Sequence, residues 1–81
     1  MQKKLCDFAI GETGKVTNVL SSGAEGVKIR RRLFDMGVTP GASVTLKKRA
    51  PLGDPIEITL RGYQLTLRKK EAKMVVVEVE Q

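Results

Sequence analysis

The sequence predicts a small, mainly β domain: a five-stranded antiparallel barrel with one short helix between its first and second strands. Its 81 residues leave room for one domain, residues 1–81, and not for two. Several short segments alternate apolar and polar residues, as half-buried strands do, and one segment instead repeats its apolar residues at helical spacing. Five short strands are too few to form two large packed sheets. We therefore expect a single bent barrel, which also leaves no sheet edge exposed.

The first strand is predicted over residues 15–20. Before it, residues 5–10 carry scattered apolar side chains and lead into two glycines, so we expect a segment that packs on the core before a turn. Within the strand, Val16 and Leu20 are expected to face one side of the sheet and Val19 the other. The serine and glycine residues that follow end the strand.

The helix is predicted over residues 24–36. Ser22, followed three residues later by Glu25, fits a capping box, in which each side chain satisfies the other residue's free backbone donor. The apolar face of the helix consists of Ile29, Leu33 and Met36. Gly37 stands where a left-handed C-terminal cap is expected, and the Thr-Pro-Gly that follows prevents the helix from resuming.

The second half of the chain predicts the other four strands. Alternating apolar residues place them at 43–48, 56–60, 65–68 and 75–80, where the last range ends at Glu80. Residues 50–53 fit a type I turn, and residues 61–64 fit a tight turn that joins the two middle strands into a hairpin. Residues 69–73 are compatible with a polar helical turn before the last strand.

The net charge of +6 arises in one segment, residues 27–50, because the segments on either side of it each sum to zero. The charged residues of this segment are Lys28, Arg30, Arg31, Arg32, Lys47, Lys48 and Arg49, opposed only by Asp35. Such a basic field suits an acidic protein, an anionic membrane surface or nucleic acid. It equally suits a solvated face that keeps the protein soluble.

Arg30 falls between the core stripe of the predicted helix and a second apolar pair, Val27 and Phe34. We expect Arg30 either to lay its stem across the core edge and keep its head in water, or to pair with a carboxylate. On either interpretation Val27 and Phe34 are separated from the main stripe. They would then close the barrel mouth or lie on the surface as a contact patch.

The composition argues against catalysis and metal binding. There is no histidine, which removes the usual proton shuttle and the commonest transition-metal ligand. Cys6 has no partner cysteine for a thiolate zinc site, so we interpret it as a small buried apolar residue. The carboxylates Asp54, Glu57 and Glu71 are expected to face solvent. With three aromatic residues in all, the chain also lacks the side chains on which single-strand nucleic-acid binders stack bases. We therefore expect no catalytic residue, metal ligand or nucleic-acid partner.

Two stretches resemble signatures of the FeoA family. Residues 30–41, which read Arg-Arg-Arg-Leu-Phe-Asp-Met-Gly-Val-Thr-Pro-Gly, resemble its helix and turn. Residues 50–56, followed by 61–63 and 67–69, resemble its second half, so the resemblance covers nearly the whole chain. It implies a cytoplasmic SH3-like barrel that assists FeoB, the membrane ferrous iron transporter with a cytosolic GTP-binding domain. The implied role is non-enzymatic: docking on the cytosolic portion of the transporter and influencing uptake or nucleotide turnover.

The resemblance also bears on cofactors and location. The family is associated with transition-metal binding, but this sequence offers no ligand cluster for Fe²⁺, and we expect no tightly bound cofactor. No apolar run approaches the ~18–20 residues that span a bilayer, and no apolar stretch of a signal peptide follows the N-terminal lysines. We expect a cytoplasmic protein that meets a membrane only through the transporter. The alternatives are an SH3-like metal-responsive module and a nucleic-acid-binding barrel driven by the basic segment.

Six residues are predicted to bind the partner: Arg31, Arg32, Phe34, Leu52, Gly53 and Asp54. Leu52 is an apolar side chain at the tip of a loop stiffened by proline and glycine, where packing alone would not require it. A loop of this kind loses little entropy on docking. The alternative is that Leu52 folds back and plugs the barrel.

Overall fold

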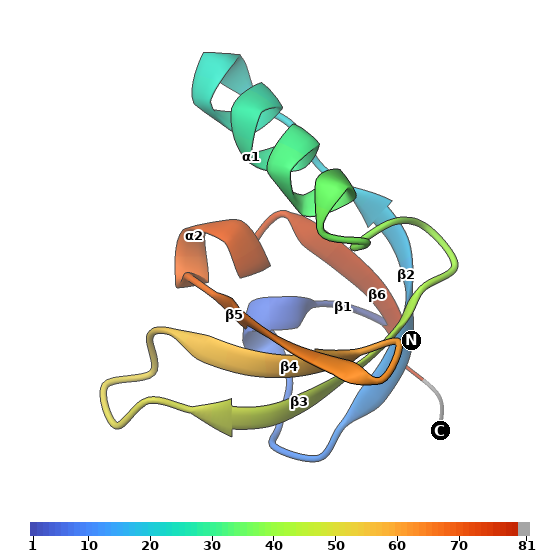
Figure 1. Cartoon of the computed structure of the whole chain (residues 1–81), viewed down its shortest axis with the longest axis vertical. Helices are drawn as coiled ribbons and strands as arrows, with labels where there is room; N and C mark the ends of the chain where they lie inside the picture. Colours follow the sequence, from blue (N-terminus) through green and yellow to red (C-terminus); the bar gives the residue numbers. More distant parts are fainter. Residues whose placement is uncertain (80–81) are drawn as a thin grey trace.

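The structure, a computed structural model, describes residues 1–79, so Glu80 of the predicted last strand lies outside the described residues. Its strands form one six-stranded antiparallel sheet in the order β1-β6-β2-β3-β4-β5, bent around a single core (Figure 1). The elements in chain order are β1 (Gln2–Lys4), the 3-10 helix η1 (Leu5–Asp7), β2 (Thr13–Val19), α1 (Gly23–Asp35), β3 (Ser43–Arg49), β4 (Ile56–Leu60), β5 (Tyr63–Leu67), α2 (Lys69–Ala72) and β6 (Val75–Val79).

The predicted closed barrel of five strands is wrong in two respects: the sheet has six strands, and it is open. The additional strand β1 pairs with β6, with Gln2 opposite Glu78 and Lys4 opposite Val76. Its Gln-Lys-Lys sequence has no alternation of apolar and polar residues. Residues 2–4 are therefore a strand because they pair with the edge of β6, and not because of their own composition. Within residues 1–79, β1 and β5 are the two edges of the sheet. Helix α1 consequently lies between the second and third strands.

The core is supplied by residues whose alternation in the sequence marks them as inward-facing. Those buried in β3, β4 and β6 are Val44, Leu46, Ile56, Ile58, Leu60, Val75, Val77 and Val79. The predicted lead-in segment is confirmed in part: Leu5 and Phe8 are buried in the same core, but Ile10 is 67% exposed. At the tight turn between β4 and β5, Arg61 and Gly62 have φ angles of 51° and 85°, the left-handed pair that a two-residue hairpin turn requires.

The prediction for the end of the first strand is wrong, because β2 contains a bulge. Its pairing with β6 shifts register between Val16 and Asn18. A bulge inserts one extra residue and reverses the side-chain alternation beyond it. Val16 and Val19 are therefore both buried, whereas Leu20, which was expected to share a face with Val16, is exposed.

Helix α1 stands at one end of the sheet, and its N-terminal half extends beyond the strands (Figure 1). Leu33 is its fully buried side chain, and Gly26 lies close against the backbone of Ser21. The predicted capping box is wrong: Ser22 is the N-cap but makes no side-chain capping bond, and the Glu25 carboxylate lies instead 3.8 Å from Lys70 Nζ.

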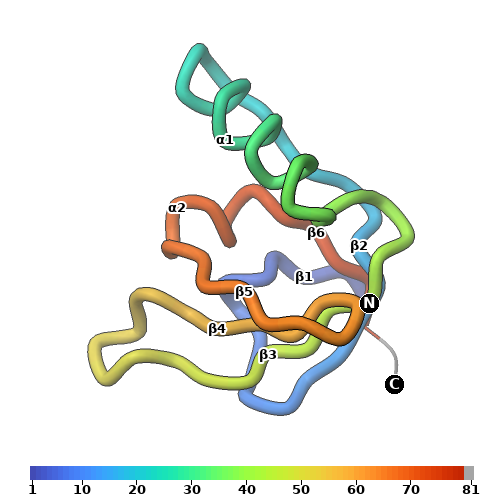
Figure 2. Tube along the Cα trace, in the orientation of Figure 1, coloured from blue at the N-terminus to red at the C-terminus, as the bar shows by residue number. Residues whose placement is uncertain are grey.

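The C-terminal end of α1 is fixed as predicted by a left-handed glycine. Gly37 has a φ angle of +93°, after which the chain returns through a loop to β3 (Figure 2). The Tyr63 hydroxyl of β5 donates a hydrogen bond to the Met36 carbonyl oxygen. A Cβ atom at position 37 would lie 2.9 Å from the Tyr63 hydroxyl oxygen. This hydrogen bond holds the C-terminal end of α1 against the β4–β5 hairpin.

Candidate functional site

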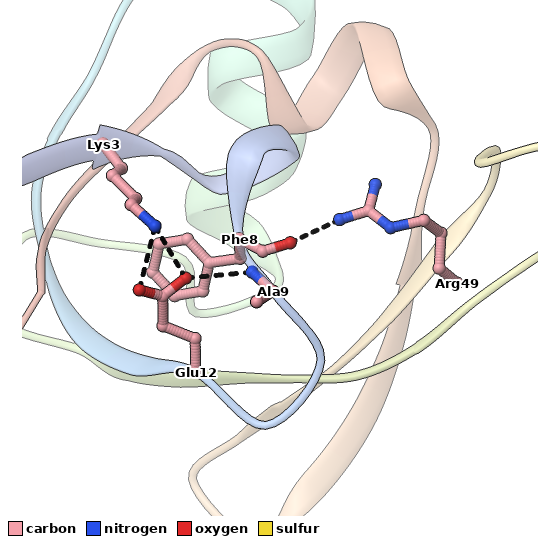
Figure 3. A network of polar contacts seen from close by, with 5 residues as sticks. All are labelled: Lys3, Phe8, Ala9, Glu12 and Arg49. Atoms are coloured by element: carbon pink, nitrogen blue, oxygen red, sulfur yellow. Dashed lines mark hydrogen bonds and ion pairs between the residues drawn. The ribbon is translucent and has the colours of Figure 1, made fainter.

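One arginine of the basic segment, Arg49, has a structural role. Its guanidinium at the end of β3 donates to the carbonyl oxygen of Phe8 (Figure 3). It also donates to the carbonyl oxygen of Cys6 at 3.4 Å. On the other side of the same segment, the Glu12 carboxylate accepts from Lys3 Nζ at 2.9 and 3.0 Å and from the Ala9 backbone N–H at 2.9 Å. The N-terminal segment is thus tied to the sheet by two charged side chains, and Arg49 is withdrawn from the free basic surface.

The Glu12 contacts predict how stability responds to acid. The hydrogen bond from Ala9 N–H, and next the one from Lys3, hold the pKa of Glu12 below its ordinary value of 4.5. A lowered folded-state pKa stabilises the fold above about pH 4.5, and this contribution is lost as the pH falls through the lowered pKa. We expect Glu12→Gln to flatten the acid limb of a plot of melting temperature against pH. Lys3→Gln, which removes the smaller cause, should flatten it less, and identical limbs in all three proteins would contradict the assignment.

Two further arginines, on α1, are also engaged. Arg30 donates from Nε to the Val19 carbonyl oxygen at 3.0 Å, and its guanidinium carbon lies 4.5 Å above the centre of the half-buried Phe34 ring. Within residues 1–79 it forms no ion pair with a carboxylate, and the residue remains exposed with its Nε on the backbone of β2. This contact fixes Arg30 and Phe34 as a stacked cation–aromatic pair on the flank of α1.

Arg32 forms an ion pair with Glu71 of α2. Arg32 Nη1 lies 2.8 Å from Glu71 Oε2, and the two side chains are 65% and 3% exposed. The other oxygen of Glu71 accepts from the Arg68 backbone N–H at 2.8 Å. The expectation that Glu71 faces solvent is wrong, because this carboxylate turns back to cap α2 and is covered by the side chain from α1. Helices α1 and α2 are thereby joined.

The outer face of α1 carries side chains that are free for a partner. Arg31 is exposed, and the apolar Val27 beside it is 54% exposed. A shallow hollow of about 280 Å³ on this face is lined by Val27, Lys28, Arg31, Arg32 and Asp35. We call these five residues, together with Phe34, the α1 face. Val27 therefore lies on the surface, whereas Phe34 packs partly against the core.

The loop between β3 and β4 holds Leu52 outward. Leu52 is 96% exposed, so the alternative in which it plugs the barrel is wrong. The loop is closed by hydrogen bonds from Gly53 N–H to the Ala50 carbonyl at 2.7 Å and from Ala50 N–H to the Pro55 carbonyl at 3.0 Å. Gly53 has a φ angle of +88°, which suits glycine at the end of this turn.

The six predicted partner-binding residues fall into two groups in the structure. Arg31, Arg32 and Phe34 belong to the α1 face, and Leu52, Gly53 and Asp54 form the loop tip. Helix α2 lies between the two groups (Figure 1), touching the first through Glu71 and the second through Lys69, whose backbone N–H donates to Asp54 Oδ1 at 2.8 Å. The sequence did not indicate this division.

Helix α2 contributes cations that the charge count by segments missed. A hollow of about 480 Å³ beside the loop is lined by Asp54, Arg68, Lys69, Lys70 and Lys73. Residues 51–81 are neutral in sum. Of their described carboxylates, Asp54 lines this hollow, whereas Glu71 is buried against Arg32 and Glu78 pairs with the N-terminal amine. The positive charge around α2 therefore depends on the tertiary structure and does not follow from a charge count along the chain.

The described residues offer no metal centre. Within residues 1–79, no three His, Cys, Asp or Glu side chains gather in a way that could hold a metal ion. Burial and, to a smaller extent, the charge of Asp7 raise the pKa of the Cys6 thiol, which keeps the thiolate ligand scarce at neutral pH. The same part of the chain contains no helix that is long and apolar enough to cross a membrane.

Comparisons with known proteins point to one family. The family model described as the FeoA domain matches residues 3–79. A curated relative from Porphyromonas gingivalis, the Fe(2+) transport protein A/Fe(2+) transporter FeoB fusion protein, is 28% identical over 76 residues, which cover 94% of this chain. The chain spans only 8% of the length of that relative.

Solved structures give the same result. The NMR structure of a FeoA-like protein from Clostridium acetobutylicum matches with a TM-score of 0.86 and 39% identity, over 99% of this chain and 88% of that one. The crystal structure of Stenotrophomonas maltophilia FeoA complexed with zinc, which is described as a prokaryotic SH3 domain protein, matches with a TM-score of 0.80 and 29% identity, over 96% and 89% of the two chains. The bent sheet is thus SH3-like, as the sequence resemblance implied.

Proposed function

The chain belongs to the FeoA domain family, and on that premise we propose that it is an accessory protein of ferrous iron uptake that docks on a FeoB-type transporter. It would act in the cytoplasm, by binding the cytosolic portion of the transporter, and without catalysing a reaction. The observation that carries this proposal is the fusion relative, in which the two proteins form one chain. A covalent link raises the effective concentration of two modules that bind each other, so such a fusion favours partners that work in contact.

The α1 face is the best-suited docking surface. Arginine and aromatic side chains are enriched at the energetic centres of protein interfaces, and this face presents Arg31, Arg32 and the Phe34 ring with the exposed apolar Val27 beside them. Arg32 is held in place by Glu71 and Phe34 by the core, so little side-chain entropy is lost on binding. An acidic patch on the transporter would complement this surface.

The test is a titration of the labelled 81-residue chain with the isolated cytosolic GTP-binding portion of the transporter. Arg31→Glu is expected to weaken binding by about 10-fold or more, as loss of a central arginine does at protein interfaces. Lys47→Glu makes the same charge change on exposed β3 and should weaken binding by less than about 2-fold, since a charge outside the contact acts only through the screened field. Equal effects of the two substitutions, with both proteins folded, would contradict docking through the α1 face.

A further inference from the structure

The loop tip and α2 form a surface whose composition differs from that of the α1 face. We call it the basic tip: Leu52 together with Arg68, Lys69, Lys70 and Lys73. The hydrogen bond from Lys69 N–H to Asp54 holds the loop and the helix side by side. Three of its four cations are lysines, all four are exposed, and its one apolar side chain is an aliphatic leucine that is 96% exposed.

This composition suits lipid headgroups better than a protein partner. Lysine is depleted at protein interfaces, where arginine and aromatic residues dominate. A lysine ammonium is instead a compact charge on a flexible stem, able to reach phosphates that have no fixed arrangement. An anionic leaflet attracts clustered lysines, and an apolar side chain beside them can enter the boundary between headgroups and acyl chains.

We propose that the basic tip binds the surface of an anionic bilayer, with Leu52 inserted among the lipids and the lysine ammonium groups on lipid phosphates. The loop is suited to insertion because its two internal hydrogen bonds, from Gly53 to Ala50 and from Ala50 to Pro55, hold Leu52 outward before any contact is made. Insertion then orders no additional backbone.

The carboxylates near the basic tip do not neutralise it. Asp54 is fixed on the Lys69 backbone N–H, and Glu25 lies 3.8 Å from Lys70 Nζ. Glu71, the third, is buried and paired with Arg32. The four cations of the tip therefore exceed the two exposed carboxylates, and the surface keeps a positive charge toward an anionic membrane.

This inference does not depend on docking to the transporter, and it departs from the sequence-based expectation that the membrane is met only through that protein. The α1 face and the basic tip have no residue in common, so the two proposals concern different surfaces. It also assigns Leu52 to lipid contact, whereas the sequence placed Leu52, together with Gly53 and Asp54, in the contact with the transporter.

The experiment is co-sedimentation of the 81-residue chain with protein-free vesicles, either of phosphatidylcholine alone or of phosphatidylcholine mixed with phosphatidylglycerol. We expect binding to the mixed vesicles at low salt, at least about 10-fold stronger than to the neutral ones, and weakened by added salt. Lys69→Gln with Lys73→Gln should lower the partition coefficient by about 20-fold, and Leu52→Ser by about 10-fold. Lys15→Gln with Lys47→Gln, two exposed lysines outside the tip, is the matched control and should change it by less than about 3-fold.

Three outcomes would overturn the inference. The first is no binding to the mixed vesicles at low salt. The second is an equal loss in the tip and control lysine variants, which would indicate adsorption by net charge alone. The third is that Leu52→Ser binds the mixed vesicles as strongly as the unchanged protein, which would show that Leu52 does not insert among the lipids. Because the vesicles contain no protein and the docking titration contains no lipid, failure of either proposal is distinguishable from failure of the other.

Discussion

Replacing Leu33 by alanine is expected to lower the free energy of unfolding by about 3 kcal/mol, as truncation of a fully buried leucine does. Leu33 is the side chain by which α1 enters the core, with no exposed surface, and α1 otherwise touches the sheet through polar contacts and half-buried residues. The cavity left behind cannot be filled by a shift of the helix, because the hydrogen bond from Tyr63 to the Met36 carbonyl oxygen holds its C-terminal end. The melting temperature should fall by about 15 °C in a domain of this size.

The control for this prediction lies on the same helix. Val27→Ala removes an exposed apolar side chain and should change the free energy of unfolding by less than about 0.5 kcal/mol. Chemical denaturation of both variants measures the difference. A loss below about 1 kcal/mol in Leu33→Ala would mean that α1 is held mainly by its polar contacts.

Gly14→Ala is expected to destabilise the fold by a similar amount, about 3 kcal/mol, through overlap. Gly14 lies in β2 between β3 and β6, where it is paired with Val44 on one side and Val79 on the other. A Cβ atom there would lie 2.5 Å from the carbonyl oxygen of Glu78 and 2.6 Å from Val77 Cγ1. Neither neighbour can yield, since one is backbone of a central strand and the other is a buried core side chain.

Lys15→Ala is the matched change at the next residue of the same strand. Lys15 is exposed, so its truncation should alter the free energy of unfolding by less than about 0.5 kcal/mol. Thermal unfolding of the two variants under identical conditions provides the comparison. Equal melting temperatures for Gly14→Ala and Lys15→Ala would show that β6 can move away from β2, and the account of a close strand approach would be wrong.

Local pattern was enough to predict much of the fold. The alternation of Ile56, Ile58 and Leu60 gave β4 and its inward face, and the spacing of Leu33 with its helical neighbours gave α1. Gly37 takes the left-handed conformation expected of a helix cap. These features depend on side-chain periodicity and backbone sterics within a few residues, which a sequence records directly.

The candidate surface was predicted less well, because each correction involves a partner distant in the sequence. Arg49 is bonded to the carbonyl oxygens of residues 6 and 8, more than forty positions away, and Arg32 is bonded to Glu71. A count of charges along the chain assigns both arginines to a free basic field. The structure leaves Arg31 exposed and shows a second basic cluster at α2, formed by Arg68, Lys69, Lys70 and Lys73.

The sequence by itself determined the SH3-like class, the strands with clear alternation, the single long helix, the turn at residues 50–53 and membership of the FeoA family. Only the tertiary structure decided that β1 exists, that the bulge in β2 turns Leu20 outward, and that the predicted contact residues form two surfaces on either side of α2. The physical reason is that periodicity is local, whereas strand pairing, bulges and ion pairs depend on which distant segments the packed core brings together.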